Sequence, residues 1–340
     1  MDVQDRTLSA QEAAIAKGSH VVHGTATDRV LRMFEGMRAY GPPRVALERG
    51  TLFTEAFRAH ETDPLVLKWA KALMNYAEKS TVCILDDELI VGRPNTWLGR
   101  WAIVYPELDG AIMPEGVKQF KKNKGGIGEV VVTEEDETII DDVLTPYWTG
   151  RDYASNFHDA IPEATRFMMY GPDPKDLLTM TMVVVPTSNQ RHSQNWTPDW
   201  GKLVRRGVKS IREEAQEKLA ALDHPRDAVH KRPFLEAVII TCDAMTTWSQ
   251  RYAQLATEKA DAEADPQRKE ELLKIAEVCN WVPENPARNF HEALQCQWWG
   301  QMFNRIEQTS SAMGQGRMDQ YLLPYYRDDL AAGRITEASA

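Results

Sequence analysis

Apolar residues recur at helical spacing in several stretches of the chain. From Pro64 the sequence PLVLKWAKALMNYAEKS places Leu67, Ala70 and Leu73 on one face, and it begins with a proline, whose missing N–H costs nothing in a first helical turn. We therefore predict an amphipathic helix in this stretch. A cap is expected from Thr62 or Asp63, since both side chains can accept a hydrogen bond from the first turn.

The same spacing predicts further helices, and the first 25 residues are expected to be loosely structured. One helix follows Asp28, which we expect to cap it, and another is the amphipathic stretch GKLVRRGVKSIREEAQEKLAAL after Trp200. Helices are also expected from Pro233 and from near Pro286. A final helix spans GRMDQYLLPYYRDDLAAG, with a kink or break at Pro324.

Strand-like segments are fewer and shorter. The sequence TVCILDDELIVG contains two short β-like pieces around Asp86 and Asp87, which predicts a hairpin. Residues 110–150 contain many turn residues and are expected to form loops and short strands. The continuous apolar run from Thr179 to Val185 is typical of a strand buried on both faces. The pattern as a whole predicts a helix-rich α/β protein.

Composition places the chain among ordinary globular proteins. It has 340 residues, 43% hydrophobic and 26% charged, enough for a large core and nominally for two domains. A net charge of -10 gives no electrostatic reason to bind nucleic acid, although a local positive pocket can still bind an anion. The longest uncharged run, Leu177 to Gln190, contains Pro186 and is too short for a membrane span.

Two further features predict a cytoplasmic protein. The N-terminus is polar and lacks the apolar stretch of a signal peptide. The cysteines lie in apolar surroundings without a CxxC pair, so we expect buried free thiols; they are Cys83, Cys242, Cys279 and Cys296.

Three short motifs suggest chemistry but lack a necessary part. HEALQ, from His291 to Gln295, resembles a zinc motif with an amide in place of the second histidine, so His291 and Glu292 are expected on a helix surface or an interface. KGGIGE, residues 124–129, lacks the GK[ST] ending of a phosphate loop and is expected to be a turn. The acids of TEEDETIIDD, residues 133–142, have no ordered ligand spacing and predict a solvated face. No metal site is predicted.

The densest set of hydrogen-bonding side chains follows the Thr179–Val185 run. The stretch TSNQRHSQNW contains Arg191, His192 and Gln194 among other polar residues. A guanidinium binds an oxyanion through paired, charge-assisted hydrogen bonds, and an amide N–H adds another. A structural role remains open, because Arg191 could instead pair with an acid and hold a loop. Gln190 and Asn195 compete with Gln194 for a position facing a ligand.

Several sequence blocks together resemble the glycyl radical enzymes, the pyruvate formate-lyase-like superfamily. DDELIVGRPN (residues 86–95) followed by YPELDG (105–110) resembles an early hairpin of that family. NPARNFHEALQ (285–295) resembles its Pro-Ala-x-x-Phe-x-Glu-Ala-Leu-Gln helix, and GRMDQYLLPYY (316–326) its Gly-Arg-x-Asp-Gln-Tyr-Leu block. The resemblance runs from about residue 28 to the end of the chain.

The resemblance implies a ten-stranded α/β barrel of two parallel half-sheets wrapped by helices. It implies a C-terminal glycyl radical, installed by a radical-SAM activating enzyme, that generates a thiyl radical on a cysteine at the barrel centre. The chain has neither that cysteine loop nor an Arg-Val-x-Gly-Tyr loop. We therefore expect a loosely ordered segment, residues 1–27, and an N-terminal portion of the enzyme domain, residues 28–340, truncated before the thiyl loop and inactive alone.

Within the superfamily, Arg191-His192 followed by SQNW is similar to the sulfonate-cleaving branch. That resemblance implies a lyase converting isethionate (2-hydroxyethanesulfonate) to acetaldehyde and sulfite. Arg191 and Gln194 would bind the sulfonate or a hydroxyl group, and His192 would contact the substrate hydroxyl or buttress the strand. The alternatives are a dihydroxypropanesulfonate sulfolyase, a diol or hydroxyproline dehydratase, and a non-catalytic scaffold module. The family also implies a homodimer in an anaerobic cytoplasm, and packaging in a bacterial microcompartment stays open.

Overall fold

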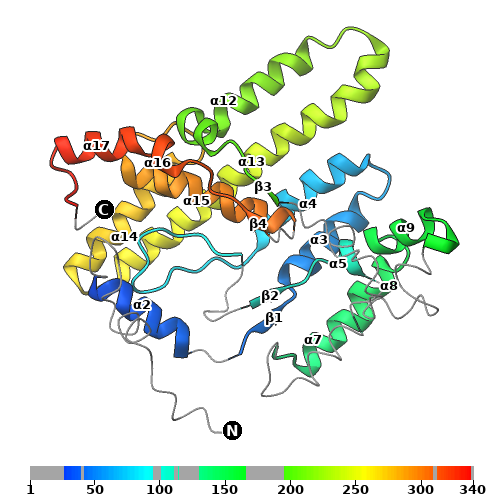
Figure 1. The fold of residues 1–340 in the computed structure, drawn as a ribbon, viewed down its shortest axis with the longest axis horizontal. Coiled ribbons are helices and arrows are strands. Elements are labelled where there is room, and N and C mark those ends of the chain that lie inside the picture. The colour runs from blue at the N-terminus through cyan, green and yellow to red at the C-terminus, as the bar shows by residue number, and fades with distance from the viewer. Residues whose placement is uncertain are drawn as a thin grey trace.

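The computed structural model describes residues 27–39, 42–94, 101–110, 114, 130–165, 195–308 and 312–337. Helices dominate the described residues (Figure 1). They are α2 (Asp28–Ala39), α3 (Glu48–Ala59), α4 (Leu65–Lys79), α5 (Pro106–Asp109), α7 (Glu134–Ile139), the π-helix η2 (Ile140–Leu144), α8 (Thr145–Trp148), α9 (Tyr153–Ala160), α12 (Trp200–Ala220), α13 (Pro225–Ala262), α14 (Pro266–Trp281), α15 (Phe290–Glu307), α16 (Met318–Tyr321) and α17 (Leu323–Ala331).

The described strands form two separate parallel pairs. β1 (Arg44–Ala46) pairs with β2 (Trp101–Ile103), with Val45 opposite Ala102. β3 (Asn195–Trp196) pairs with β4 (Ala312–Met313), although more than a hundred residues separate them in the chain. Parallel pairs need long crossover connections, and here helices supply them. The helix-rich α/β class is confirmed to this extent.

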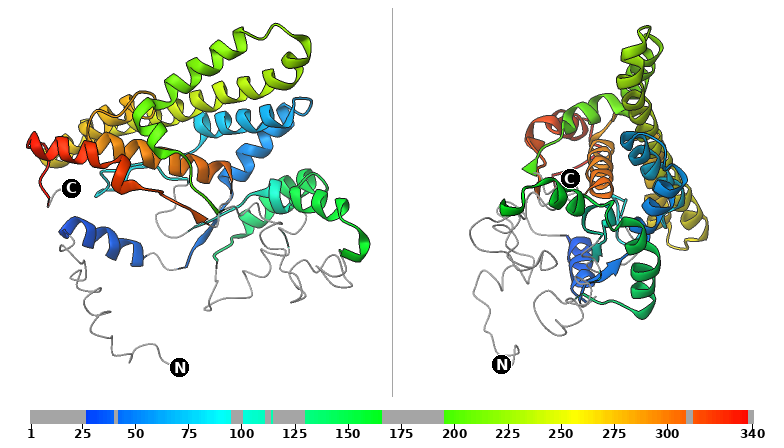
Figure 2. Two further views of the ribbon diagram at one scale, coloured as in Figure 1. Left: turned by 45° about the horizontal axis from the view of Figure 1, so that its top comes forward. Right: turned by 90° about the vertical axis from the view of Figure 1, so that its right-hand side faces the viewer.

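The core lies where α13 meets α4, α12, α14 and α15. The α12–α13 pair extends beyond the other helices, as two further views show (Figure 2). Trp248 and Tyr252 of α13 pack against Trp299 of α15, with ring centroids 5.1 and 5.2 Å from the Trp299 ring. The Tyr76 ring of α4 also packs against Trp248, with the two ring centroids 6.1 Å apart. Aromatic burial of this kind holds three helices together.

Several predicted helices are confirmed, but their first residues differ from the predictions. Thr27, not Asp28, accepts the hydrogen bond from the first turn of α2. α4 begins after Pro64 with no side-chain cap, because Asp63 is paired with Lys71 at 2.5 Å. α13 begins at Pro225 and runs through Pro233. A helix boundary depends on which partner a polar side chain finds, and spacing alone does not determine that partner.

Gly207 makes a kink in the predicted helix after Trp200. Its φ of 65° interrupts α12, and a Cβ at this position would lie 2.3 Å from the carbonyl oxygen of Glu284. The next two amides donate across this close approach, Val208 N–H to Pro283 O at 2.9 Å and Lys209 N–H to Glu284 O at 3.0 Å. The kink therefore exchanges helical hydrogen bonds for bonds to the loop before α15.

The prediction of loops and short strands over residues 110–150 is wrong for residues 134–148, which form α7, η2 and α8. The acids after Val131 occupy the first turn of α7, where the helix dipole favours negative charge. Thr133 and Asp136 close a capping box, and Asp136 is buried, so the acidic run is only partly a solvated face.

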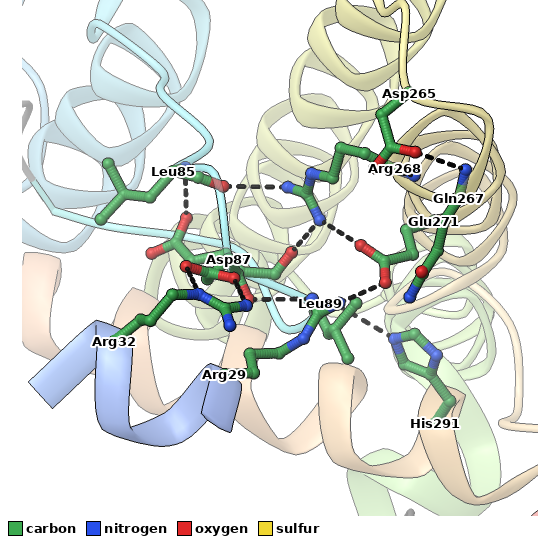
Figure 3. A network of polar contacts seen from close by, with 11 residues as sticks. Arg29, Arg32, Leu85, Asp87, Leu89, Asp265, Gln267, Arg268, Glu271 and His291 are labelled. Carbon is green, nitrogen blue, oxygen red and sulfur yellow. Dashed lines mark hydrogen bonds and ion pairs between the residues drawn. The ribbon is translucent and has the colours of Figure 1, made fainter. Parts of the chain in front are cut away.

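The segment around Asp87 contains the expected turn but no strands among residues 81–94, so the predicted hairpin is wrong. Its backbone carbonyls are bound by arginine side chains instead (Figure 3). Arg268 of α14 donates to Leu85 O at 2.9 Å, and Arg29 of α2 donates to Asp87 O at 3.1 Å. Both guanidinium groups also donate to the Glu271 carboxylate. These bonds replace the partners that a second strand would supply.

Further along this segment, a buried side chain binds both backbone groups of Val91, as a neighbouring strand would. The Gln295 side chain accepts from Val91 N–H at 2.8 Å and donates to Val91 O at 2.7 Å. The Tyr252 hydroxyl accepts from Arg93 N–H at 3.0 Å. Gln295 comes from the NPARNFHEALQ block, and Val91 from the DDELIVGRPN block. Two blocks that carry the family resemblance are therefore bound directly to each other.

Three other predictions concern cysteines, helix surfaces and membranes. Cys83 is half-buried and three more cysteines are buried, all as free thiols, and burial raises the pKa of Cys242 to about 11. Glu292, predicted on a helix surface or an interface, is not on the helix surface: it is fully buried and pairs with Arg288. None of the described helices has the length and apolar character that a bilayer span requires. The predicted buried strand Thr179–Val185 lies outside the described residues.

Candidate functional site

The predicted substrate-binding residues are not among those that the structure describes. Arg191, His192 and Gln194 lie in the gap before residue 195, as does Gln190. Asn195 is described as the first residue of β3, through its backbone only. The structure therefore shows the strand that receives the polar stretch and the surroundings of that strand, which a site at these residues must adjoin.

A cavity of about 280 Å³ lies just beyond the carboxyl ends of β3 and β4. Because the two strands are parallel, the residues that follow each strand meet at the same edge. Residues 197–201 line it from one strand and residues 315–317 from the other. Crevices at the carboxyl ends of parallel strands are common ligand positions in α/β proteins.

Two arginines line this cavity. The guanidinium group of Arg205 folds back over the first turn of α12, where a Cβ at Gly201 would lie 2.9 Å from Nη1. In the part of the chain that the structure describes, Arg205 makes no ion pair. Arg317 pairs with Asp319 at 2.7 Å and makes two hydrogen bonds to it. Arg205 thus has open hydrogen-bonding capacity at this edge, and Arg317 keeps the N–H groups that Asp319 does not bind.

A chain of amide side chains fixes the other wall of the cavity. Gln315, just after β4, accepts from the Gln297 side chain and donates to Gln301 at 2.8 Å, both on α15. The Tyr321 hydroxyl donates to Gln315 O at 3.0 Å, and the Trp200 indole donates to Gly314 O at 2.9 Å. Partly buried side chains bonded to one another in this way hold a wall in one arrangement.

The donors at this edge suit an anion better than a cation. Guanidinium and amide N–H groups bind planar or tetrahedral oxyanions. Among the described residues of the lining, the one acid is Asp199, which caps α12 by accepting from Lys202 N–H at 2.9 Å. Sequence reasoning missed Arg205, whose helical position carries no signal of a ligand. Arg317 and Gln315 lie in or beside the GRMDQYLLPYY block, whose sequence indicates the family but no ligand.

A second and larger cavity, about 820 Å³, lies among α4, α12, α13 and α15. The charged residues that the structure describes in its lining are Asp199 and Glu307, both acidic. A sulfonate buried there would lack the compensating positive charge that a buried anion requires. The anion chemistry expected from the sequence therefore does not belong in this cavity.

No group of three or more His, Cys, Asp or Glu side chains in the described ranges is arranged to hold a metal ion. At the HEALQ motif, Glu292 is bound by Arg288 at 2.5 Å and the His291 ring contacts Leu89 O at 3.1 Å. Burial lowers the pKa of His291, which favours the neutral ring. Both side chains of the motif are thus occupied by structural contacts.

Comparison with known proteins gives a consistent result. Residues 25–340 match the family model described as pyruvate formate lyase-like. The isethionate sulfite-lyase of Oleidesulfovibrio alaskensis is 45% identical over 314 residues, and that of Nitratidesulfovibrio vulgaris is 46% identical over 314 residues. Each alignment covers 92% of this chain and 37% of the relative. The chain thus spans well under half the length of these curated relatives.

Solved structures agree with the family match. The glycerol-bound, B12-independent glycerol dehydratase from Clostridium butyricum is 29% identical with a TM-score of 0.82, over 94% of this chain and 39% of that one. A glycyl radical enzyme from Archaeoglobus fulgidus is 30% identical with a TM-score of 0.81, over 91% of this chain and 38% of that one. The chain belongs to the pyruvate formate lyase-like family of glycyl radical enzymes.

Proposed function

We propose that the chain works within a glycyl radical carbon–sulfur lyase that cleaves isethionate to acetaldehyde and sulfite. The observation that carries the proposal is the identity of 45–46% with two isethionate sulfite-lyases over 92% of the chain. The identity with the glycerol dehydratase is much lower, 29%. Because the chain spans 37% of those lyases, the proposal concerns an enzyme of their length.

In this proposal the chain binds and orients the sulfonate. Arg191 donates paired hydrogen bonds to the sulfonate oxygens, and Gln194 adds an amide N–H to a sulfonate oxygen or to the hydroxyl group. His192 contacts the hydroxyl or buttresses the strand. The glycyl radical, installed by a radical-SAM activating enzyme, supplies the hydrogen-atom chemistry, and no residue of this chain is assigned to that step.

The described surroundings of β3 support an anion site beside this strand. The polar stretch leads directly into β3, and the cavity beyond the strand is lined by Arg205 and Arg317. Residues 28–340 are proposed as one portion of the enzyme domain, with β1–β2 and β3–β4 as parts of the two parallel half-sheets of a ten-stranded barrel. A homodimer in the cytoplasm is proposed with them, and microcompartment packaging stays open.

The alternatives predict different uses of Arg191. A dihydroxypropanesulfonate sulfolyase would use the same guanidinium and would differ in the contacts to the additional hydroxyl group. A neutral diol would give the guanidinium no anion to bind, so a diol dehydratase leaves Arg191 unexplained. A non-catalytic scaffold would tolerate its loss. Arg191 is therefore the residue whose substitution separates these functions.

The test is Arg191→Ala in the full-length enzyme that contains this chain, activated anaerobically. We expect sulfite release from isethionate to be abolished while the glycyl radical signal in electron paramagnetic resonance is unchanged. Arg327→Ala is the matched control, since Arg327 is exposed on α17. Near-normal sulfite release from Arg191→Ala would remove the assigned role, and turnover of a neutral diol by the unsubstituted enzyme would favour the dehydratase.

A further inference from the structure

The 820 Å³ cavity is an apolar site that the proposed reaction does not use. Its lining comes from the start of α4, from α12 and α13, and from α15. Two of its lining residues, Leu65 and Phe234, are 65% and 59% exposed, which is unusual for apolar side chains of this size. The volume is within the range of small-molecule sites, roughly 300–1,000 Å³.

Aromatic side chains and acidic groups together define the chemistry of the lining. Trp69, Trp200, Phe234 and Phe303 contribute aromatic surface from four different helices. Aromatic faces attract cations as well as apolar groups. Of the lining residues that the structure describes, none is basic, and Cys242 stays a neutral thiol because its pKa is raised to about 11.

Glu307 gives the cavity a polar end. It is the last residue of α15, so its carboxyl group adds to the partial negative charge of that helix terminus. Burial raises the pKa of this carboxyl group, and the nearby Arg49 lowers it by less. Arg49 is itself paired with Glu107 at 2.6 Å and donates to Ile306 O and Glu307 O. Among described residues, no side chain donates a hydrogen bond to the Glu307 carboxylate.

We propose that this cavity binds an amphiphilic monocation, a protonated amine on an apolar body. The apolar body packs between Trp69, Phe234 and Met245, and the ammonium group lies at Glu307, where the carboxylate and the end of α15 compensate its charge. Charge complementarity selects this occupant. The acidic lining repels an anion, and a neutral alkyl chain has no polar group that could bind Glu307. The inference does not rest on the proposed sulfonate chemistry, which requires the opposite charge.

The test compares three eight-carbon probes by isothermal titration calorimetry at pH 7.5: octylamine, octan-1-ol and octanoate. Octylamine is expected to bind about ten-fold or more tightly than octan-1-ol, because a charge-assisted hydrogen bond contributes more than a neutral one. Octanoate is expected to bind more weakly than octan-1-ol. Glu307→Gln keeps the size of the side chain and removes its charge, so it should abolish the preference for octylamine.

A second pair of variants tests the position of the apolar body. Phe234→Ala should weaken binding of octylamine and octan-1-ol alike. Val229→Ala is the matched control, because Val229 is 70% exposed on the same helix and does not line the cavity. Equal affinities for octylamine and octan-1-ol, or an octylamine preference that survives Glu307→Gln, would overturn the proposal. Failure of all three probes to bind would also overturn it.

Discussion

Substitution of Gln295 is the clearest test of how the segment of residues 81–94 is fixed to the rest of the structure. Its side chain is 1% exposed and binds both the N–H and the C=O of Val91, which is itself fully buried. No strand pairs with this segment in the described residues, so the two backbone groups depend on one amide side chain. We predict that Gln295→Ala strongly destabilises the chain.

The magnitude follows from the two groups that lose their partners. A buried donor or acceptor left without a partner costs about 1–3 kcal/mol, so the two together cost about 2–6 kcal/mol. The free energy of unfolding of a typical domain is about 5–15 kcal/mol, so this destabilisation would remove a large share of it. Gln295→Met keeps the side-chain volume and removes the polar atoms. If the lost hydrogen bonds, rather than lost packing, cause the destabilisation, Gln295→Met should lower the free energy of unfolding nearly as much as Gln295→Ala.

Urea unfolding followed by tryptophan fluorescence measures this difference, since Trp248 and Trp299 pack in the adjacent core. Gln254→Ala is the matched control, because Gln254 is exposed on α13 and bonds only to Glu258 in the described structure. That control should change the free energy of unfolding by less than about 0.5 kcal/mol. If Gln295→Ala is no more costly than the control, the account of how this segment is held is wrong.

Three further predictions concern burial, backbone geometry and pH. Arg49→Met should cost about 3–5 kcal/mol, because it leaves the Glu107 carboxylate buried without its partner, and Glu107→Leu in the same chain should recover part of the loss. Gly207→Ala should destabilise far more than Gly150→Ala: both have positive φ, but only Gly207 faces a backbone oxygen. Burial lowers the pKa of His291, so below pH 6.5 the unfolded state binds more protons than the folded state. The free energy of unfolding should therefore decrease as the pH is lowered below 6.5, and it should decrease less in His291→Gln.

The same denaturation assay checks all three. Additive costs of Arg49→Met and Glu107→Leu would argue against a coupled pair. Equal destabilisation by the two glycine variants would show that the backbone angle alone, without the contact to Glu284 O, sets the cost. For His291, unfolding midpoints at pH 7.5 and pH 5.5 give the comparison, and an identical pH dependence in wild type and variant would remove the histidine from the explanation.

Periodicity predicted those parts of the fold whose apolar faces are continuous in the sequence. The face of α4, the amphipathic α12 and the break between α16 and α17 before Pro324 all follow from local spacing. The two main failures have different causes. The β-like segment up to Val91 is held by side chains of α14 and α15, 183 and 204 residues away, and nothing local distinguishes that arrangement from a hairpin. Val131 forms an isolated parallel bridge with Arg44, but the residues after it form a helix that begins at the capping box of Thr133 and Asp136, where loops and short strands were predicted.

For the site, the sequence predicted a function and a polar stretch, while tertiary structure added the cavity beyond β3. In the sequence, Arg205 looks like any solvated arginine on a helix. In the structure, its guanidinium group folds back over Gly201, where there is no Cβ in the way. Gln315 contacts the α15 amides from the end of β4, the strand that pairs with β3. The predicted Arg191, His192 and Gln194 remain predictions, because they lie outside the described residues.

The most direct measurement of the central claim is sulfite release from isethionate by a chimeric enzyme. In it, this chain replaces the matching 314 residues of the Oleidesulfovibrio alaskensis isethionate sulfite-lyase, and the radical is installed anaerobically. We predict that sulfite and acetaldehyde form in equal amounts and that Arg191→Ala stops both. A chimera that carries the glycyl radical at full yield and releases no sulfite from isethionate would contradict the account.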